Sequence, residues 1–141
     1  MIEYTGYKIV RCVDGKLLSY SLPPRLATEY VVGEAAKRRE GWGPLSVISC
    51  LYGAMGFWRV SGGKLFECTY IPSDEGNYYM PLDVLGNRHY PFMIRASNSG
   101  IAVCSRHIPF SDYAEKLTLT REIFGLKFVN GEGLPDYVNV E

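Results

Sequence analysis

The sequence has little that points to a particular chemistry, and several features are missing altogether. Its apolar runs fall well short of the ~20 residues that a membrane-spanning helix needs. The first residues, Met1 to Tyr4, show no basic segment followed by an apolar one, so no signal peptide is expected. Fifteen basic and fifteen acidic residues cancel, so bulk charge does not favour binding to nucleic acid or to a membrane surface. These absences predict a soluble, cytoplasmic protein.

Catalytic and metal-binding motifs are also missing. There is no phosphate loop, no G-x-G-x-x-G after a strand, no H-E-x-x-H and no G-x-S-x-G. The two histidines lack nearby thiolates or carboxylates that would complete a metal site, so no metal or cofactor is predicted. The four cysteines lie singly among apolar neighbours: Cys12, Cys50, Cys68 and Cys104. They are expected to be small buried hydrophobic residues in a reducing compartment, with a disulfide left open by the spacing.

What is present indicates one ordinary globular domain. The 141 residues, 47% apolar and 21% charged, suit a single domain over residues 1–141, with an irregular tail from about residue 130. Eleven tyrosines are an unusual number. Because tyrosine combines a large apolar area with a polar tip, the surplus suits edge-of-core packing in a β-rich protein, an interface, or a stacking site.

The pattern of apolar residues predicts an α+β fold, mainly an antiparallel sheet with one central short helix and room for a second short helix. The central helix belongs to a strand–helix–strand unit from Pro44 to Ile71. Its strands are Leu45 to Ile48 and Lys64 to Ile71, and its helix is Cys50 to Arg59, with Ser49 as the N-cap. The two glycines within this helix each cost about 1 kcal/mol relative to alanine. Something is therefore expected to pack closely against them.

Strands and turns are also predicted in the first third of the chain. Tyr7 to Val13 and Lys16 to Tyr20 flank Asp14-Gly15, a strong hairpin signal. Glu29 to Val32 is a third short strand. Residues 34–44 are expected to form a helical turn or an exposed loop, with the Lys-Arg-Arg run inside it as a solvated face.

The second half is less regular. Residues 72–88 are predicted to be a long loop with one ordered piece near residues 78–80. Pro91 to Ala96 and Ile101 to His107 are predicted to form a hairpin. Asp112 to Phe124 fits both a strand and a helix, and its β-branched residues favour the strand.

That hairpin suggests a binding site. It would bring two Arg-His pairs to one end, where two guanidinium groups and two imidazoles could bind phosphate or carboxylate. For the first pair alone, solvated loop residues are the favoured interpretation, because exposed polar residues are common. A further arginine lies within an apolar strand, either at an exposed edge or in a cleft. The candidate ligand-binding residues are Arg11, Arg88, His89, Arg106 and His107.

The segment GYKIVRCVDGKLLSY (6–20), with residues 30–33 and 45–70, resembles a small domain of unknown function from phages, prokaryotic viruses and prokaryotes. In that domain a Y-K-V-V-R strand leads to a D-G-K-L-x-S hairpin and later to a strand–helix–strand unit. The resemblance implies a viral or mobile-element protein, located in the host cytoplasm if viral. It implies no activity.

The segment GPLSVISCLYGAMGFWRVSGGKLFECTYI is similar in layout to the core of ADP-ribosyltransferases. Those enzymes hold a nicotinamide dinucleotide with a His or Arg on an early strand, a position that Arg11 could match. Ser46 or Ser49 could match their serine strand. No segment clearly supplies the late-strand catalytic glutamate, for which Glu115 and Glu122 are the candidates.

The sequence therefore favours a non-enzymatic binding domain for a protein or a small anionic ligand. A homodimer is left open, and neither nucleic acid nor a membrane is an expected partner. The alternative is an ADP-ribosyltransferase-like enzyme that uses a nicotinamide dinucleotide.

Overall fold

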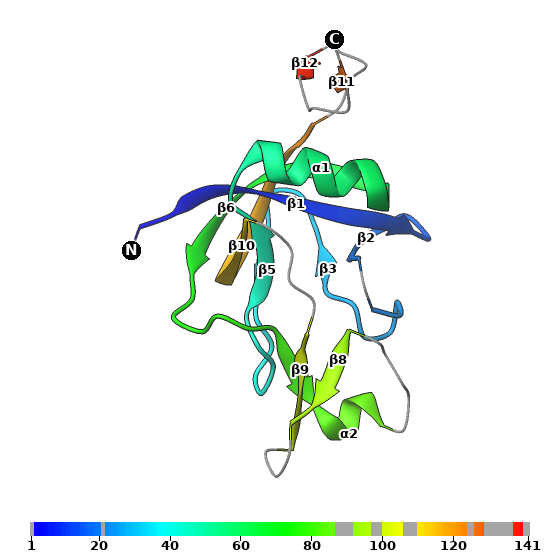
Figure 1. Cartoon of the computed structure of the whole chain (residues 1–141), viewed down its shortest axis with the longest axis vertical. Coiled ribbons are helices and arrows are strands. Elements are labelled where there is room, and N and C mark those ends of the chain that lie inside the picture. The colour runs from blue at the N-terminus through cyan, green and yellow to red at the C-terminus, as the bar shows by residue number, and fades with distance from the viewer. Residues whose placement is uncertain are drawn as a thin grey trace.

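Figure 1 shows the computed structural model of the chain, in which a strand-rich body carries the helix α1 (Leu51–Ser61) and a smaller sheet carries the helix α2 (Leu82–Leu85). The structure describes residues 2–20, 22–86, 92–96, 100–105 and 110–123, and the backbone of residues 126–128 and 137–139. The strands are β1 (Tyr4–Val13), β2 (Lys16–Ser19), β3 (Glu29–Tyr30), β4 (Ala35–Lys37), β5 (Leu45–Ile48), β6 (Lys64–Pro72), β7 (Tyr79–Pro81), β8 (Met93–Arg95), β9 (Ile101–Cys104), β10 (Ser111–Ile123), β11 (Leu126–Phe128) and β12 (Tyr137–Asn139). The described chain is thus mostly antiparallel sheet with two short helices, an α+β fold.

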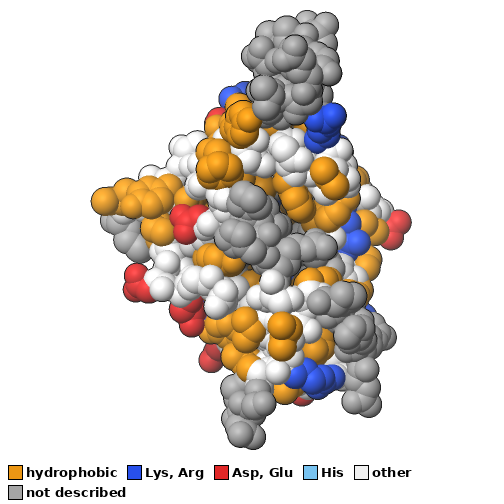
Figure 2. Space-filling view, viewed as in Figure 1, with side chains coloured by type: hydrophobic (Ala, Val, Ile, Leu, Met, Phe, Trp, Pro, Cys, Tyr) orange, Lys and Arg blue, Asp and Glu red, His pale blue; other side chains and the backbone are white. Residues whose placement is uncertain are grey.

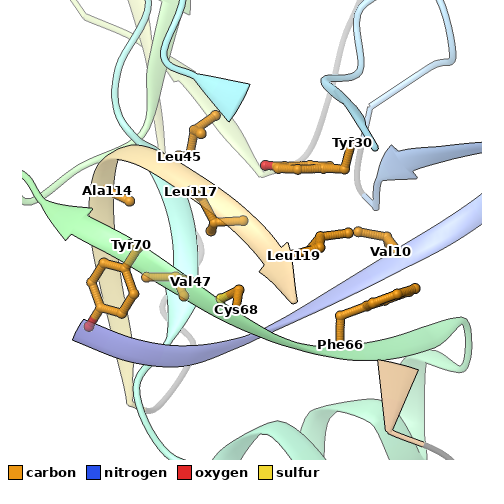
Figure 3. Close-up of a cluster of buried hydrophobic side chains, with 10 residues drawn as sticks. All are labelled: Val10, Tyr30, Leu45, Val47, Phe66, Cys68, Tyr70, Ala114, Leu117 and Leu119. Carbon is orange, nitrogen blue, oxygen red and sulfur yellow. The ribbon is translucent and has the colours of Figure 1, made fainter. Parts of the chain in front are cut away.

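The main sheet curls into a small barrel. β1 pairs with β2, β5 and β6, and β10 pairs with β4, β5 and β6, all antiparallel. The ring β1–β6–β10–β5 therefore returns to β1. Apolar side chains from these strands and from β3 fill the interior, as Figure 3 shows: Val10, Tyr30, Leu45, Val47, Phe66, Cys68, Tyr70, Ala114, Leu117 and Leu119.

The predicted strand–helix–strand unit is confirmed as β5, α1 and β6. The helix buries Ala54 and Met55 against β1, β5 and β6. The predicted cap was wrong. The Sγ atom of Cys50 accepts the hydrogen bond from the Gly53 amide at 3.3 Å, because the Ser49 hydroxyl instead donates to the Phe110 carbonyl oxygen at 3.0 Å.

Close packing was predicted at both helix glycines and occurs at one. A Cβ atom on Gly53 would lie 2.5 Å from the Phe110 ring, whereas a Cβ on Gly56 would meet nothing within 4 Å. Gly53 therefore allows the start of β10 to approach the helix, and Gly56 has no such role among the described residues.

The first hairpin is confirmed, and its turn has the geometry that the sequence requires. Asp14 and Gly15 both have positive φ, at 50° and 78°, as in a type I′ turn. The third strand is shorter than predicted, ending at Tyr30. The interpretation of residues 34–44 as a helical turn or loop was wrong for Ala35–Lys37, which forms β4 on the edge of β10. Pairing with a long neighbouring strand has overridden the local helix preference of the alanines.

The basic run that begins at Lys37 is not a uniformly solvated face. Arg38 and Arg39 are half-buried, and only Lys37 is exposed. Arg39 donates to the carbonyl oxygens of Leu26 and Ala27, and its guanidinium carbon lies 4.5 Å from the centre of the Trp42 ring.

The second half contains a small three-stranded sheet, ordered β7-β9-β8. The ordered piece predicted near residues 78–80 is confirmed as β7, and α2 follows it directly. The predicted hairpin is confirmed for β8 and β9, with Met93 opposite Cys104 and Arg95 opposite Ala102. The ambiguous segment is confirmed as a strand, β10, whose thirteen residues run along both β5 and β6.

None of the four cysteines, all of which lie in described parts of the chain, forms a disulfide. Cys68 is fully buried, as predicted, whereas Cys12 is exposed, contrary to prediction. No described helix has the length and hydropathy to cross a membrane.

Candidate functional site

A cavity of about 130 Å³ lies where β1 and β5 diverge. β1 pairs with β5 only at Tyr7↔Ile48, and its pairing with β2 begins at Val10. Lys8 and Ile9 pair with β6 on one side of β1. On the side that faces β5 and β2, they have no partner in the described strand pairings. The cavity occupies this gap, and its walls come from β1, β2, β3, β5, β10, α1 and the small sheet.

Aromatic side chains dominate the walls. Phe57 of α1 and Phe92 contribute, and the lining includes five of the eleven tyrosines: Tyr7, Tyr20, Tyr30, Tyr78 and Tyr113. On the face shown in Figure 2, described hydrophobic side chains form several patches, with charged side chains mostly around the margin. The tyrosine surplus is thus partly explained by one cavity that offers aromatic walls.

Lys8 is the charged residue of this cavity. Lys8 lies on the same face of β1 as Gly6 and Val10, which is the inner face. Only 7% of the residue is exposed. The Nζ atom donates to the Ser46 carbonyl oxygen at 2.5 Å and to the Ser46 hydroxyl at 3.0 Å. It also lies 5.6 Å from the centre of the Tyr30 ring. The lysine thus bridges the gap to the edge of β5.

The charge of Lys8 has no acidic partner among the described residues. No described ion pair includes it. Burial lowers the pKa of Lys8 from its ordinary value of 10.5 to about 8, and the Cys68 side chain opposes this change only in part. A buried cation without a counter-charge is costly, so this position favours either an incoming anion or loss of the proton.

Tyr30 provides a second unusual polar group. It is 2% exposed, and its hydroxyl has no hydrogen-bond partner among the described residues. Burial raises the pKa of Tyr30 well above its ordinary value, so the hydroxyl remains protonated and able to donate. Figure 3 shows this hydroxyl pointing toward Leu45, which also lines the cavity. Native proteins rarely leave buried polar groups unpaired, so a bound molecule is a natural partner for it.

Replacing Tyr30 with phenylalanine is expected to raise the free energy of unfolding by about 1 kcal/mol, because an unpaired buried hydroxyl is costly. Urea denaturation measures the change. Tyr70→Phe is the matched control, since the Tyr70 hydroxyl donates to Asp112 Oδ2 at 2.7 Å and its loss should destabilise the protein. Equal destabilisation by both substitutions would show that the Tyr30 hydroxyl is already bonded in the free protein.

The cavity can hold a small planar molecule with one polar group. Its volume is similar to the ~150 Å³ of an engineered cavity that binds benzene. The tyrosine and phenylalanine rings can pack against an aromatic ring, while Lys8 supplies a charged donor for an oxygen. No group of three metal-ligating side chains occurs among the described residues.

A second polar cluster surrounds Arg38. Its guanidinium pairs with Glu75 and with Glu115, the latter at 2.8 Å, and donates to the Tyr79 hydroxyl at 2.9 Å. The hydrogen bond from Ser73 lowers the pKa of Glu115, and Arg38 adds to this effect. The guanidinium is thus fully engaged by two carboxylates, and the cluster ties β4 and β10 to the segment before β7 and offers no free cation to an anionic ligand.

The predicted site residues do not include Lys8, and only one of them can be placed. Arg11 is half-buried on β1, where its Nε donates to the Ser19 carbonyl oxygen at 3.2 Å. Its Nη2 is buried with no partner among the described residues, and the residue does not line the cavity. The other four lie outside the described residues, so their convergence stays a prediction: Arg88, His89, Arg106 and His107.

The residues matched to ADP-ribosyltransferases have separate surroundings. Ser46 accepts from Lys8, Ser49 donates to Phe110, and Glu115 pairs with Arg38. Glu122 lies 3.9 Å from Lys64. No described hydrogen bond or ion pair links any of these serines and glutamates to the early-strand arginine.

No protein-family profile, curated protein or solved structure matches the chain. The two resemblances drawn from the sequence therefore stay predictions, and the function has to be argued from the cavity.

The sequence held one signal for Lys8 that the prediction of site residues did not use. Lys8 and Val10 are two residues apart in the predicted strand from Tyr7 to Val13, so they share one of its faces. A charged residue on the inward face of an apolar strand is as informative as Arg11 on the opposite face. The barrel, which decides which face is inward, could not be deduced from this alternation.

Proposed function

We propose that this chain is a non-enzymatic binding domain that holds a small aromatic carboxylate in the Lys8 cavity. The observation that carries the proposal is a buried ammonium group with no acidic partner among the described residues. Of the expected partners, a protein or a small anion, the cavity favours the small anion because its polar groups lie inside a hollow of limited volume.

The charge of the ligand follows from Lys8. A carboxylate oxygen would supply the missing counter-charge and a charge-assisted hydrogen bond, which is stronger than a neutral one. Ser46 already holds the Nζ atom through two acceptors, so the ammonium is positioned before the ligand arrives. Pre-positioning reduces the ordering cost of binding.

The size and shape of the ligand follow from the walls. About 130 Å³ admits a single six-membered ring with a short substituent, and aromatic side chains favour a planar ring. Benzoate is the simplest probe that meets both conditions. A ligand of this size is expected to bind with a dissociation constant of roughly 10 μM to 1 mM.

The affinity for benzoate is expected to fall about tenfold between about pH 6.5 and about pH 9.5. Lys8 has a pKa of about 8 in the free protein, so it is charged at the lower pH and mostly neutral at the higher one. Benzoate itself stays anionic over this range. Titration calorimetry or NMR shift titration at both pH values measures the effect.

Benzamide is the control, because it has the same ring and no charge, and its affinity should not change in this way. Two results would contradict the proposal: no benzoate binding at either pH, or benzoate affinity that is equal at both.

A further inference from the structure

We propose that Lys8 also captures small aromatic aldehydes as a reversible imine within the same cavity. Imine formation is a covalent activity beyond anion binding. It rests on the proposed function in that the same cavity is taken to be the ligand site. The carbonyl group would meet the amine at Lys8 Nζ, and the ring would occupy the space between the aromatic walls.

The hydrogen bonds of Lys8 suit a neutral amine. A neutral amine has two N–H groups and one lone pair. The Nζ atom has two hydrogen-bond acceptors, the carbonyl and hydroxyl oxygens of Ser46, and its third neighbour is the Tyr30 ring. Both N–H groups can therefore stay bonded after the ammonium loses a proton. The lone pair is then left for a carbonyl carbon.

Burial makes the neutral amine available near neutral pH. With a pKa of about 8, about half of Lys8 is neutral at pH 8, whereas an ordinary lysine is almost fully charged there. Lysines that form imines are typically activated by removal from water in this way. No acidic side chain among the described residues pairs with Lys8 to hold its proton in place.

The reaction balances without a cofactor. The lone pair of Nζ forms a C–N bond with the carbonyl carbon as the C=O π bond breaks, and one Nζ proton moves to the carbonyl oxygen to give a carbinolamine. The C–O bond then breaks, and the second Nζ proton leaves with the departing hydroxyl, so that aldehyde and amine give imine and one water molecule. Tyr30 also lines this cavity, and its ring lies next to the Nζ atom at which the bond would form.

The two ligands should respond to pH in opposite ways. Anion binding needs the charged form of Lys8 and weakens above pH 8, whereas imine formation needs the neutral form and accelerates as pH rises through 8. This opposition separates the imine proposal from the anion proposal.

The test is reductive trapping with benzaldehyde and cyanoborohydride on the full chain, followed by intact mass and peptide mapping. We expect a benzyl group on Lys8, added at least tenfold faster than to any other lysine, and peptide mapping separates it from label on the α-amino group, whose ordinary pKa is also about 8. Saturating benzoate should protect Lys8 from this labelling. Lys8→Arg should remove the fast labelling, while Lys37→Arg, at an exposed position on β4, should leave it unchanged.

Labelling spread evenly over the lysines in the unmodified chain would overturn the imine proposal, and this result does not depend on whether a variant folds. Benzoate binding with the predicted pH dependence, but without fast labelling of Lys8, would overturn the imine proposal alone. Fast labelling without benzoate binding would overturn the anion proposal alone.

Discussion

Replacing Lys8 with methionine is expected to weaken benzoate binding about 10- to 100-fold. A hydrogen bond to a charged group contributes about 1.5–3 kcal/mol, which corresponds to a change of this size in the dissociation constant. Methionine has a similar length and no charge, so the aromatic walls should keep their places. Titration at about pH 6.5, where Lys8 is charged, measures the loss.

The control is Lys37→Met, which removes an exposed charge from β4 and should leave the affinity unchanged. An affinity for benzoate that survives in the Lys8 variant would place the anion elsewhere on the molecule.

The same substitution should change how stability depends on pH. The pKa of Lys8 is lower in the folded protein than in the unfolded chain, so between about pH 8 and 10.5 the unfolded chain binds more protons. The contribution of Lys8 to stability therefore increases as pH rises through this window. The methionine variant should lose that increase, and it should be at least as stable as the unmodified protein at pH 7, because an uncompensated buried charge has been removed.

Gly43→Ala is expected to destabilise the protein by about 2–3 kcal/mol. A Cβ atom at this position would lie 2.5 Å from the Tyr79 amide nitrogen and 3.0 Å from the Asn77 carbonyl oxygen. These are backbone atoms, so no side-chain rotation relieves the contact. The clash would also disturb the hydrogen bond that the Gly43 amide donates to the Tyr79 carbonyl oxygen at 2.7 Å.

Gly43 matters for the cavity because it holds the segment before β5 against β7. Tyr78, next to β7, is part of the cavity wall, so benzoate binding should weaken together with stability. Urea denaturation and benzoate titration measure the two effects. Gly76→Ala is the matched control, since a Cβ there meets nothing within 4 Å. Equal stability of the two variants would show that the barrel and the small sheet are not joined in this way.

The parts of the fold that the sequence predicted are those determined by neighbouring residues. The turn at Asp14-Gly15 needs two residues that accept positive φ, and the central helix has an apolar stripe between two strands. The parts that failed depend on distant residues. β4 forms because it pairs with the edge of β10, which lies about eighty residues later in the chain. Ser49 is not the cap because its hydroxyl donates a hydrogen bond to the Phe110 carbonyl oxygen.

Lys8 was not predicted as a site residue for the same reason. Alternation along β1 separates two faces, but only closure of the barrel shows that the face of Lys8 is the inner one. The partner of Lys8 is Ser46, thirty-eight residues away, which no local pattern indicates. Five of the eleven tyrosines line one cavity, which composition alone could not separate from edge-of-core packing or an interface.

The most direct test of the central claim is the titration of the lysine side chains by NMR, with the Cε positions labelled and with and without benzoate. The account predicts one lysine, assigned through Lys8→Arg, with a pKa near 8 in the free protein and a clearly higher value when benzoate is bound, because the carboxylate stabilises the charged form. Ordinary lysine titration at every position, unchanged by benzoate, would contradict it.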